Sequence, residues 1–230
     1  MGARSSPPWW GAWYAETVSQ HFEDLLLRDQ GGRSPLSEGA CAKRRAEFFS
    51  GRWCARKAIC QLTDSDHPII GMRPDGLPDW PPGLIGSISH SATRAVAVVA
   101  AAEECLAIGV DVQDRVPPET AARVSGFVLS LPEAERCRAS LGEPWFEVMF
   151  SAKETLFKGL FPRCGKYFGH REVEAMAVDG TNRVVSLALC NNVGYWRRGQ
   201  RFRVRYEVFP NRVFTWMCLR AGAQSNALVD

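Results

Sequence analysis

Long apolar segments are absent from this chain of 230 residues. The longest uninterrupted apolar run, residues 95–102, is far shorter than the roughly 20 residues that a membrane-spanning helix needs. The N-terminus lacks the apolar core of a signal peptide, and Gly2 with Ser6 matches the myristoylation pattern only loosely. We therefore expect a cytoplasmic protein that has no membrane partner.

Metal-binding cysteine spacings and a strong net charge are also missing. None of the eight cysteines are spaced as Cys-x-x-Cys, which disfavours a zinc site, and several stand in apolar runs, which indicates reduced, buried thiols. The net charge is only +3, too small to indicate nucleic-acid binding by itself. With 46% hydrophobic and 23% charged residues, the composition is typical of a globular protein and excludes wholesale disorder.

Three catalytic signatures do not occur either. There is no G-x-x-x-x-G-K-[ST] phosphate loop, no G-x-G-x-x-G turn and no G-x-S-x-G nucleophile elbow. Their absence disfavours nucleoside triphosphatases, dinucleotide-dependent enzymes and acyl hydrolases of the Ser/His/Asp type.

The hydrophobic pattern predicts several helices and strands separated by loops. Helices are expected over residues 13–28, 40–62, 116–138 and 144–161, with the third broken at the capping box of Ser130 and Glu133 and the last ended by Pro162. Strands are expected over residues 84–89, 95–101, 107–112, 172–178, 184–189, 202–209 and 213–219. Because helices and strands do not alternate regularly, we predict an α+β fold, with a hint of two similar lobes.

Two carboxylates stand among apolar neighbours. Asp111 lies within a predicted strand, and Glu154 shares a helix face with Lys158 and three phenylalanines. Asp111 is either satisfied by backbone donors or engaged in function, and Glu154 and Lys158 are either a surface ion pair or part of a site. Together they suit a cation with oxygen ligands and a phosphate, because Mg²⁺ takes one or two carboxylates and completes its shell with water and phosphate oxygens.

Positive charge is concentrated before these carboxylates. Within residues 43–57 six cations stand against Glu47 alone, so this helix presents either a solvated basic face or an anion-binding site. His90 is flanked by Ser89 and Ser91 at the end of a predicted strand. This histidine is either structural or, with its hydroxyl neighbours, suited to contact a phosphate.

Six segments in this order resemble the 4′-phosphopantetheinyl transferases. The resemblance is to the monomeric, two-lobed kind associated with enterobactin and other siderophore or antibiotic synthetases. It is strong over residues 40–162 and weak over the last strands. The segments that carry it are residues 42–48 (AKRRAEF), 51–56 (GRWCAR), 80–81 (WP), 86–91 (GSISHS), 108–112 (IGVDV) and 150–158 (FSAKETLFK).

The resemblance implies a fold and a reaction. Two similar lobes related by a pseudo-twofold axis, residues 1–108 and 109–230, would each pack a small, mostly antiparallel sheet on helices, with the active site in the cleft between them. The enzyme would transfer the 4′-phosphopantetheine of coenzyme A to a serine of an acyl or peptidyl carrier protein domain of a fatty acid, polyketide or nonribosomal peptide synthase. Mg²⁺, or Mn²⁺, would be required, and adenosine 3′,5′-bisphosphate would be released by a monomeric enzyme.

By the same resemblance, individual residues acquire expected roles. Asp111 and Glu154 would be the metal ligands and, with Lys158, the catalytic residues, and Glu154 is the candidate base for the carrier serine. Coenzyme A would be bound by basic and polar side chains, namely Arg44, Arg52, Arg73, Ser89, His90, Lys153 and Lys158. Carrier docking would use Arg115, Arg123, Phe127 and Arg136, which otherwise belong to a solvated helix with scattered charge.

Two positions depart from the family pattern. Gln113 stands where the family usually has an acid, and a neutral amide can hold a metal-bound water but is a poor anionic ligand. Leu77 stands where some relatives have a basic residue. The first departure leaves Gln113 as a doubtful third metal ligand.

Two alternatives to the transferase remain at this stage. A nucleic-acid-binding module could use the basic helix and the five arginines within residues 197–205, although this run also suits a charged edge strand and the small net charge argues against extensive backbone binding. The other alternative is a different Mg²⁺-dependent phosphotransfer or nucleotide enzyme, or a relative that has lost activity through Gln113.

Overall fold

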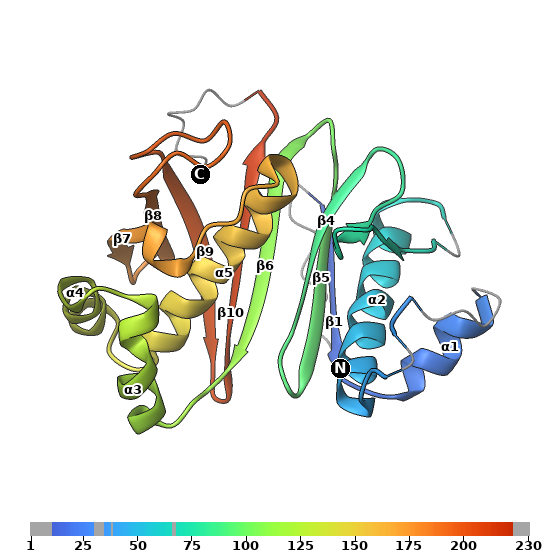
Figure 1. Ribbon diagram of the computed structural model, residues 1–230, viewed down its shortest axis with the longest axis horizontal. Coiled ribbons are helices and arrows are strands. Elements are labelled where there is room, and N and C mark those ends of the chain that lie inside the picture. Colours follow the sequence, from blue (N-terminus) through green and yellow to red (C-terminus); the bar gives the residue numbers. More distant parts are fainter. Residues whose placement is uncertain (1–10, 30–34, 38, 66–67, 223–230) are drawn as a thin grey trace.

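The computed structural model describes residues 11–29, 35–37, 39–65 and 68–222. Two antiparallel sheets stand side by side in Figure 1, each with a long helix on one face. The smaller sheet has the order β1 (Ala12–Thr17), β5 (Arg94–Ala101), β4 (Leu84–His90). The larger has the order β6 (Cys105–Asp114), β10 (Arg212–Arg220), β9 (Arg201–Phe209), β8 (Val184–Leu189), β7 (Val173–Asp179). The predicted α+β class with two lobes is confirmed.

The helices complete the two lobes. Helix α2 (Ala42–Leu62) packs on β5 and β1, and α1 (His21–Asp29) packs on α2. Helix α5 (Trp145–Cys164) crosses the larger sheet, as Figure 1 shows, with α4 (Leu131–Leu141) packed against its side. The remaining short elements are α3 (Pro118–Val128), the 3-10 helix η1 (His170–Glu172), and a two-stranded ribbon of β2 (Gly71–Met72) and β3 (Pro78–Asp79). No described helix is both long and apolar enough to cross a membrane.

Most predicted elements are present, with two corrections. Residues 13–17, predicted as the start of a helix, belong to strand β1. Successive side chains of β1 point to opposite faces of the sheet: Tyr14 packs on the α2 side, whereas Trp13 contacts Phe214 of the other lobe. Helix α5 continues past Pro162 and ends before Gly165, whose φ of 60° suits glycine.

The apolar core has three main parts. One lies between α5 and the larger sheet, a second between α2 and the smaller sheet, and a third between the two sheets. Strand β5 contributes to two of them, because Ala97 and Val99 face α2 while Val96 and Val98 face β6. Residues of both lobes therefore bury apolar surface against each other, which holds the lobes together.

The two sheets join where β5 turns into β6. Strands β4 and β6 lie against each other but belong to different sheets. Serine hydroxyls bridge them: the backbone N–H groups of Val110 and Val112 donate to Ser87 Oγ (3.2 Å) and Ser89 Oγ (3.3 Å). The predicted division between residues 108 and 109 would cut β6, so we propose that the lobes divide at the turn between β5 and β6.

Strand β6 also runs very close to α5. A Cβ added at Gly109 would lie 2.1 Å from the backbone oxygen of Thr155, so only glycine allows this approach. Gly159 lies on the helix side of the same contact, where an added Cβ would be 3.5 Å from the Gly109 nitrogen. The close approach brings Asp111, two residues after Gly109, within reach of α5 side chains.

Candidate functional site

Asp111 is the centre of a polar cluster between the lobes. Its side chain is nearly buried, and its Oδ1 accepts hydrogen bonds from Ser89 Oγ (2.7 Å) on β4 and Lys158 Nζ (2.6 Å) on α5. Its Oδ2 accepts a hydrogen bond from Ser151 Oγ (2.7 Å), one helical turn before Glu154. Three donors from two elements thus compensate the buried carboxylate.

A chain of buried hydroxyls continues behind Asp111. Ser151 Oγ lies 2.8 Å from Thr215 Oγ1, which lies 2.5 Å from Thr155 Oγ1, and all three side chains are fully buried. Thr215 also donates to the backbone oxygen of Ser151 (3.0 Å). This network fixes the carboxylate from the side opposite Lys158, and no pattern in the sequence predicted it.

Lys158 joins the two lobes electrostatically. Its ammonium donates to both Ser89 Oγ (2.8 Å) and Asp111 Oδ1, while about a quarter of the side chain stays exposed. The predicted trio of Ser89, Asp111 and Lys158 is therefore brought together. A partly exposed cation held by a buried carboxylate is well placed to attract an anion in the neighbouring cleft.

Glu154 points to a different partner. Its Oε1 lies 2.6 Å from His170 Nε2, and the His170 ring is 5.3 Å from the ring of Phe150. These two residues line a hollow of about 250 Å³ together with aromatic residues such as Phe157 and Tyr167. Sequence reasoning missed His170, which lies sixteen residues beyond Glu154 with no motif around it.

A larger cleft of about 490 Å³ lies between the lobes. Its walls include Trp80 and Gly86 from the first lobe and Lys158 from the second. A Cβ at Gly86 would lie 2.6 Å from the Trp80 ring, so glycine lets this ring pack against β4. Of the predicted cofactor-binding residues, Arg73 and Lys158 line this cleft. Its volume is within the range of small-molecule sites.

His90 and Arg44 lie beside the polar cluster. Arg44 Nη1 is 3.5 Å from His90 Nε2, and Glu47 is 3.8 Å from His90 Nδ1. Burial lowers the pKa of His90 below its ordinary value of 6.5. The cations Lys158 and Arg44 add to this effect, whereas the carboxylates Glu47 and Asp111 oppose it. An arriving phosphate would favour the protonated ring and reverse the shift.

Other basic side chains of α2 have partners within the first lobe and do not form a continuous solvated basic face. Arg52 is buried, donates to the backbone oxygen of Gly71 (3.1 Å) and stacks over Phe48, and burial lowers its pKa to about 10. Further pairs are Lys43 with Glu47, Arg45 with Glu23, and Lys57 over the ring of Trp53. Most of the run is therefore engaged within the lobe, which weakens the interpretation as a nucleic-acid surface.

Lys153 does not lie where its predicted role requires. It is buried in the second lobe, where its ammonium is 2.8 Å from Glu133 and donates to backbone oxygens of Val128, His170 and Val173. The pKa of Lys153 is lowered, chiefly by burial, although the neighbouring Glu133 carboxylate acts in the opposite direction. All of its protons are engaged, so Lys153 supports the fold and is not free to contact a phosphate.

The remaining predicted residues have local partners. Arg73 pairs with Asp75 (2.7 Å) at the mouth of the cleft, and Gln113 Nε2 donates to the backbone oxygen of Asp114 (3.0 Å). Across the described ranges, no three or more His, Cys, Asp and Glu side chains form a metal-binding group. The hydrogen bond of Gln113 engages its amide nitrogen, and a third metal ligand at its amide oxygen stays a prediction.

Comparison with known proteins accounts for this arrangement. The family described as "4'-phosphopantetheinyl transferase N-terminal domain" matches residues 33–100. The 4'-phosphopantetheinyl transferase PptT of Mycobacterium tuberculosis is 34% identical over 186 residues, which cover 73% of this chain and 80% of the relative. The chain belongs to the 4′-phosphopantetheinyl transferase family.

Two further relatives agree with this assignment. The 4'-phosphopantetheinyl transferase Svp of Streptomyces mobaraensis is 33% identical over 190 residues, covering 80% of this chain and 76% of the relative. Enterobactin synthase component D of Salmonella typhimurium is 35% identical over 124 residues, which cover 53% of this chain and 50% of the relative. The predicted family, and with it a transferase, is confirmed. In this phosphopantetheinyl transferase the family match ends at residue 100, one residue before β5 ends.

Proposed function

We propose that this enzyme transfers the 4′-phosphopantetheine arm of coenzyme A to a serine of an acyl or peptidyl carrier domain. The observation that carries the proposal is Lys158, which is held by Asp111 and Ser89 and lines the cleft between the lobes. A nucleophile that attacks a pyrophosphate needs mainly positioning and neutralisation of charge, which a fixed cation supplies. The family membership supports coenzyme A as the donor.

In this proposal, different parts of coenzyme A bind in the cleft and in the neighbouring hollow. Lys158 and Arg73 would contact the phosphates in the larger cleft, and the ring of Trp80 offers an apolar wall. Phe157 lines both spaces, so the pantetheine arm can extend past it into the aromatic hollow beside Glu154. His90 and Arg44, next to the cluster, would contact a further phosphate of coenzyme A.

In this proposal Mg²⁺ would be held by Asp111, which binds Lys158, and by Glu154, one turn before Lys158 on α5. Asp111 and Glu154 offer two carboxylates, and magnesium sites typically use one or two carboxylates with water and substrate phosphates. When bound, the ion would neutralise charge on the pyrophosphate and on the departing adenosine 3′,5′-bisphosphate. Ser89 and Ser151 orient the Asp111 carboxylate by donating hydrogen bonds to its Oδ1 and Oδ2.

Glu154 is the proposed base for the carrier serine. The serine hydroxyl must lose its proton as its oxygen bonds to phosphorus and the pyrophosphate P–O bond breaks. The Glu154 carboxylate can accept that proton directly or through a water molecule, and His170, 2.6 Å away, orients it. Because both side chains are about one-quarter to one-third exposed, the proton can then pass to solvent.

An exposed part of the second lobe suits the acidic, helical carrier domain expected of this family. Phe127 on α3 and Leu131 on α4 are 78% and 79% exposed, and Arg123 is exposed on α3. Two other residues predicted for docking, Arg115 and Arg136, form ion pairs with acids of the same lobe. Docking would therefore rest on the apolar pair with Arg123.

A mass-shift assay tests the proposal. The enzyme is incubated with coenzyme A, Mg²⁺ and apo carrier proteins from fatty acid, polyketide and nonribosomal peptide pathways. We expect the mass of one phosphopantetheine to be added to at least one carrier. Lys158→Ala should lower the rate at least tenfold, whereas Lys166→Ala, which removes an exposed lysine bonded to a backbone oxygen, should not. No added mass on any carrier, with Mg²⁺ or Mn²⁺, would contradict the proposal.

A further inference from the structure

Two cysteines lie in direct contact where the two lobes meet. The sulfur atoms of Cys105, at the start of β6, and Cys218, near the end of β10, are 2.6 Å apart. This separation is only slightly longer than the 2.05 Å of a disulfide bond, although both thiols are free. Cys105 is fully buried and Cys218 is half-buried.

The local strand pairing explains why the two thiols meet. Leu219 pairs with Ala107, but Arg220 pairs with Cys105, so β6 has one extra residue at this point of the ladder. The irregularity turns the Cys105 side chain toward the apolar contact between the sheets, which Cys218 also faces. Without it, Cys105 would point to the same side as Ala107, toward α5.

The two thiols share one hydrogen bond, which acts on the pKa of both. The pKa of Cys105 is lowered, chiefly by the hydrogen bond from Cys218, and backbone hydrogen bonds contribute to the same shift. The pKa of Cys218 is raised by the same hydrogen bond. Either sulfur can donate this hydrogen bond, so when one thiol loses its proton the other donates to the resulting thiolate, which is the nucleophilic form.

We propose that Cys105 and Cys218 are a redox modification site at which a hydroperoxide forms a reversible intramolecular disulfide. Hydrogen peroxide converts one thiol to a sulfenic acid and releases one water. The sulfur of the other thiol then attacks it, the S–S bond forms, the S–O bond breaks and a second water leaves. Two thiols and one peroxide thus give one disulfide and two waters, and an added dithiol reverses the change.

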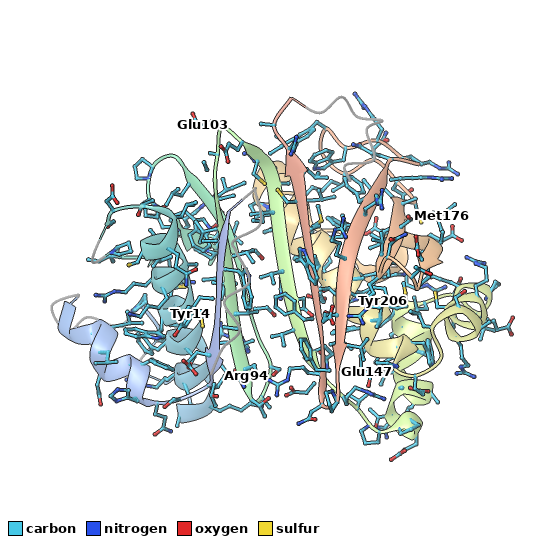
Figure 2. The ribbon with its side chains drawn as sticks, turned by 180° about the vertical axis from the view of Figure 1, so that it is seen from behind. Tyr14, Arg94, Glu103, Glu147, Met176 and Tyr206 are labelled. Atoms are coloured by element: carbon cyan, nitrogen blue, oxygen red, sulfur yellow. The ribbon has the colours of Figure 1, made fainter. Side chains whose placement is uncertain are left out.

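The disulfide would close a loop around most of the second lobe. Strands β6 and β10 lie at the two ends of this lobe in the sequence and pair in the sheet. The turn that carries Glu103 lies beside this junction (Figure 2), and Ala221 N donates to Glu104 O at 2.9 Å. Because the link restricts the unfolded chain, we expect oxidation to raise the thermal unfolding midpoint by about 5 °C or more.

Peroxide treatment followed by mass spectrometry tests this site. The full chain is exposed to hydrogen peroxide, free thiols are blocked with N-ethylmaleimide, and peptides are mapped without reduction. We expect a loss of two hydrogen atoms, a peptide that links Cys105 to Cys218, a higher unfolding midpoint, and reversal by dithiothreitol. Cys218→Ser should abolish the link, whereas Cys41→Ser, which changes an exposed cysteine, should leave it intact.

Several results would overturn the inference. These are a wild-type chain in which the two cysteines stay unlinked under peroxide, a link between other cysteines in their place, or irreversible oxidation of either thiol without a link. The wild-type peptide map decides the question even if a serine variant fails to fold. The outcome is independent of phosphopantetheine transfer, because Asp111 lies on the other face of β6, toward α5.

Discussion

Removal of the Ser151 hydroxyl probes how the buried network controls Asp111. Ser151→Ala deletes the hydrogen bond to Asp111 Oδ2, while Ser89 and Lys158 still hold Oδ1. Thr215, the other partner of the hydroxyl, keeps its hydrogen bonds to Thr155 and to the Ser151 backbone. The substitution therefore acts mainly on the carboxylate.

The size of the effect follows from the charge of the acceptor. A hydrogen bond to a charged group contributes about 1.5–3 kcal/mol, and about 1.4 kcal/mol corresponds to tenfold in rate. We expect kcat/KM for coenzyme A to fall about 10- to 100-fold in Ser151→Ala. The Mg²⁺ concentration that gives half-maximal rate should rise as well, because a carboxylate with a loosened orientation is a weaker ligand.

The assay is steady-state transfer to an apo carrier, with the metal varied at fixed coenzyme A. Ser125→Ala is the matched control, because Ser125 is only partly buried on α3 and its hydroxyl donates to the backbone oxygen of Ala122. Thermal unfolding of both variants shows whether the enzyme remains folded. If folded Ser151→Ala keeps kcat/KM within twofold of wild type and an unchanged metal dependence, the hydroxyl network does not control Asp111.

Three further substitutions test other parts of the account. Gly109→Ala places a methyl 2.1 Å from the Thr155 oxygen and should lower the free energy of unfolding by about 2 kcal/mol or more in urea; a change under 0.5 kcal/mol would refute the close approach. Lys153→Met leaves Glu133 buried without its partner and should cost about 3–5 kcal/mol, measured the same way; an intact stability with a raised KM for coenzyme A would restore Lys153 to the binding site. Phe127→Ala should raise the KM for the carrier about tenfold and leave the KM for coenzyme A unchanged; equal changes in both would argue against docking at α3.

The predictable parts of the fold are those with strong local signals. In the capping box, the Glu133 backbone N–H donates to Ser130 Oγ and the Ser130 backbone N–H donates to the Glu133 carboxylate, as expected from the spacing. Long periodic segments such as α2 and α5 were likewise predicted to within a few residues. Strand β1 was not predicted, because an alternating segment of six residues is too short to be distinguished from the start of a helix.

The candidate site was predictable only where a motif carried it. Asp111, Ser89 and Lys158 were predicted from the resemblance, and they contact one another. Lys153 was predicted from the same resemblance, but adjacent helix residues differ by about 100° in direction, and its side chain points into the lobe. His170 could not be predicted, because its approach to Glu154 depends on how η1 packs against α5.

A structure of the enzyme with coenzyme A and Mg²⁺ bound would decide whether Lys158, Asp111 and Glu154 form the active site. We expect the pyrophosphate to lie in the cleft between the lobes within hydrogen-bond distance of Lys158, and Asp111 and Glu154 to be ligands of the metal. The pantetheine arm should pass Phe157 toward the hollow beside Glu154. A coenzyme A molecule bound outside this cleft, or a metal that contacts neither carboxylate, would contradict this expectation.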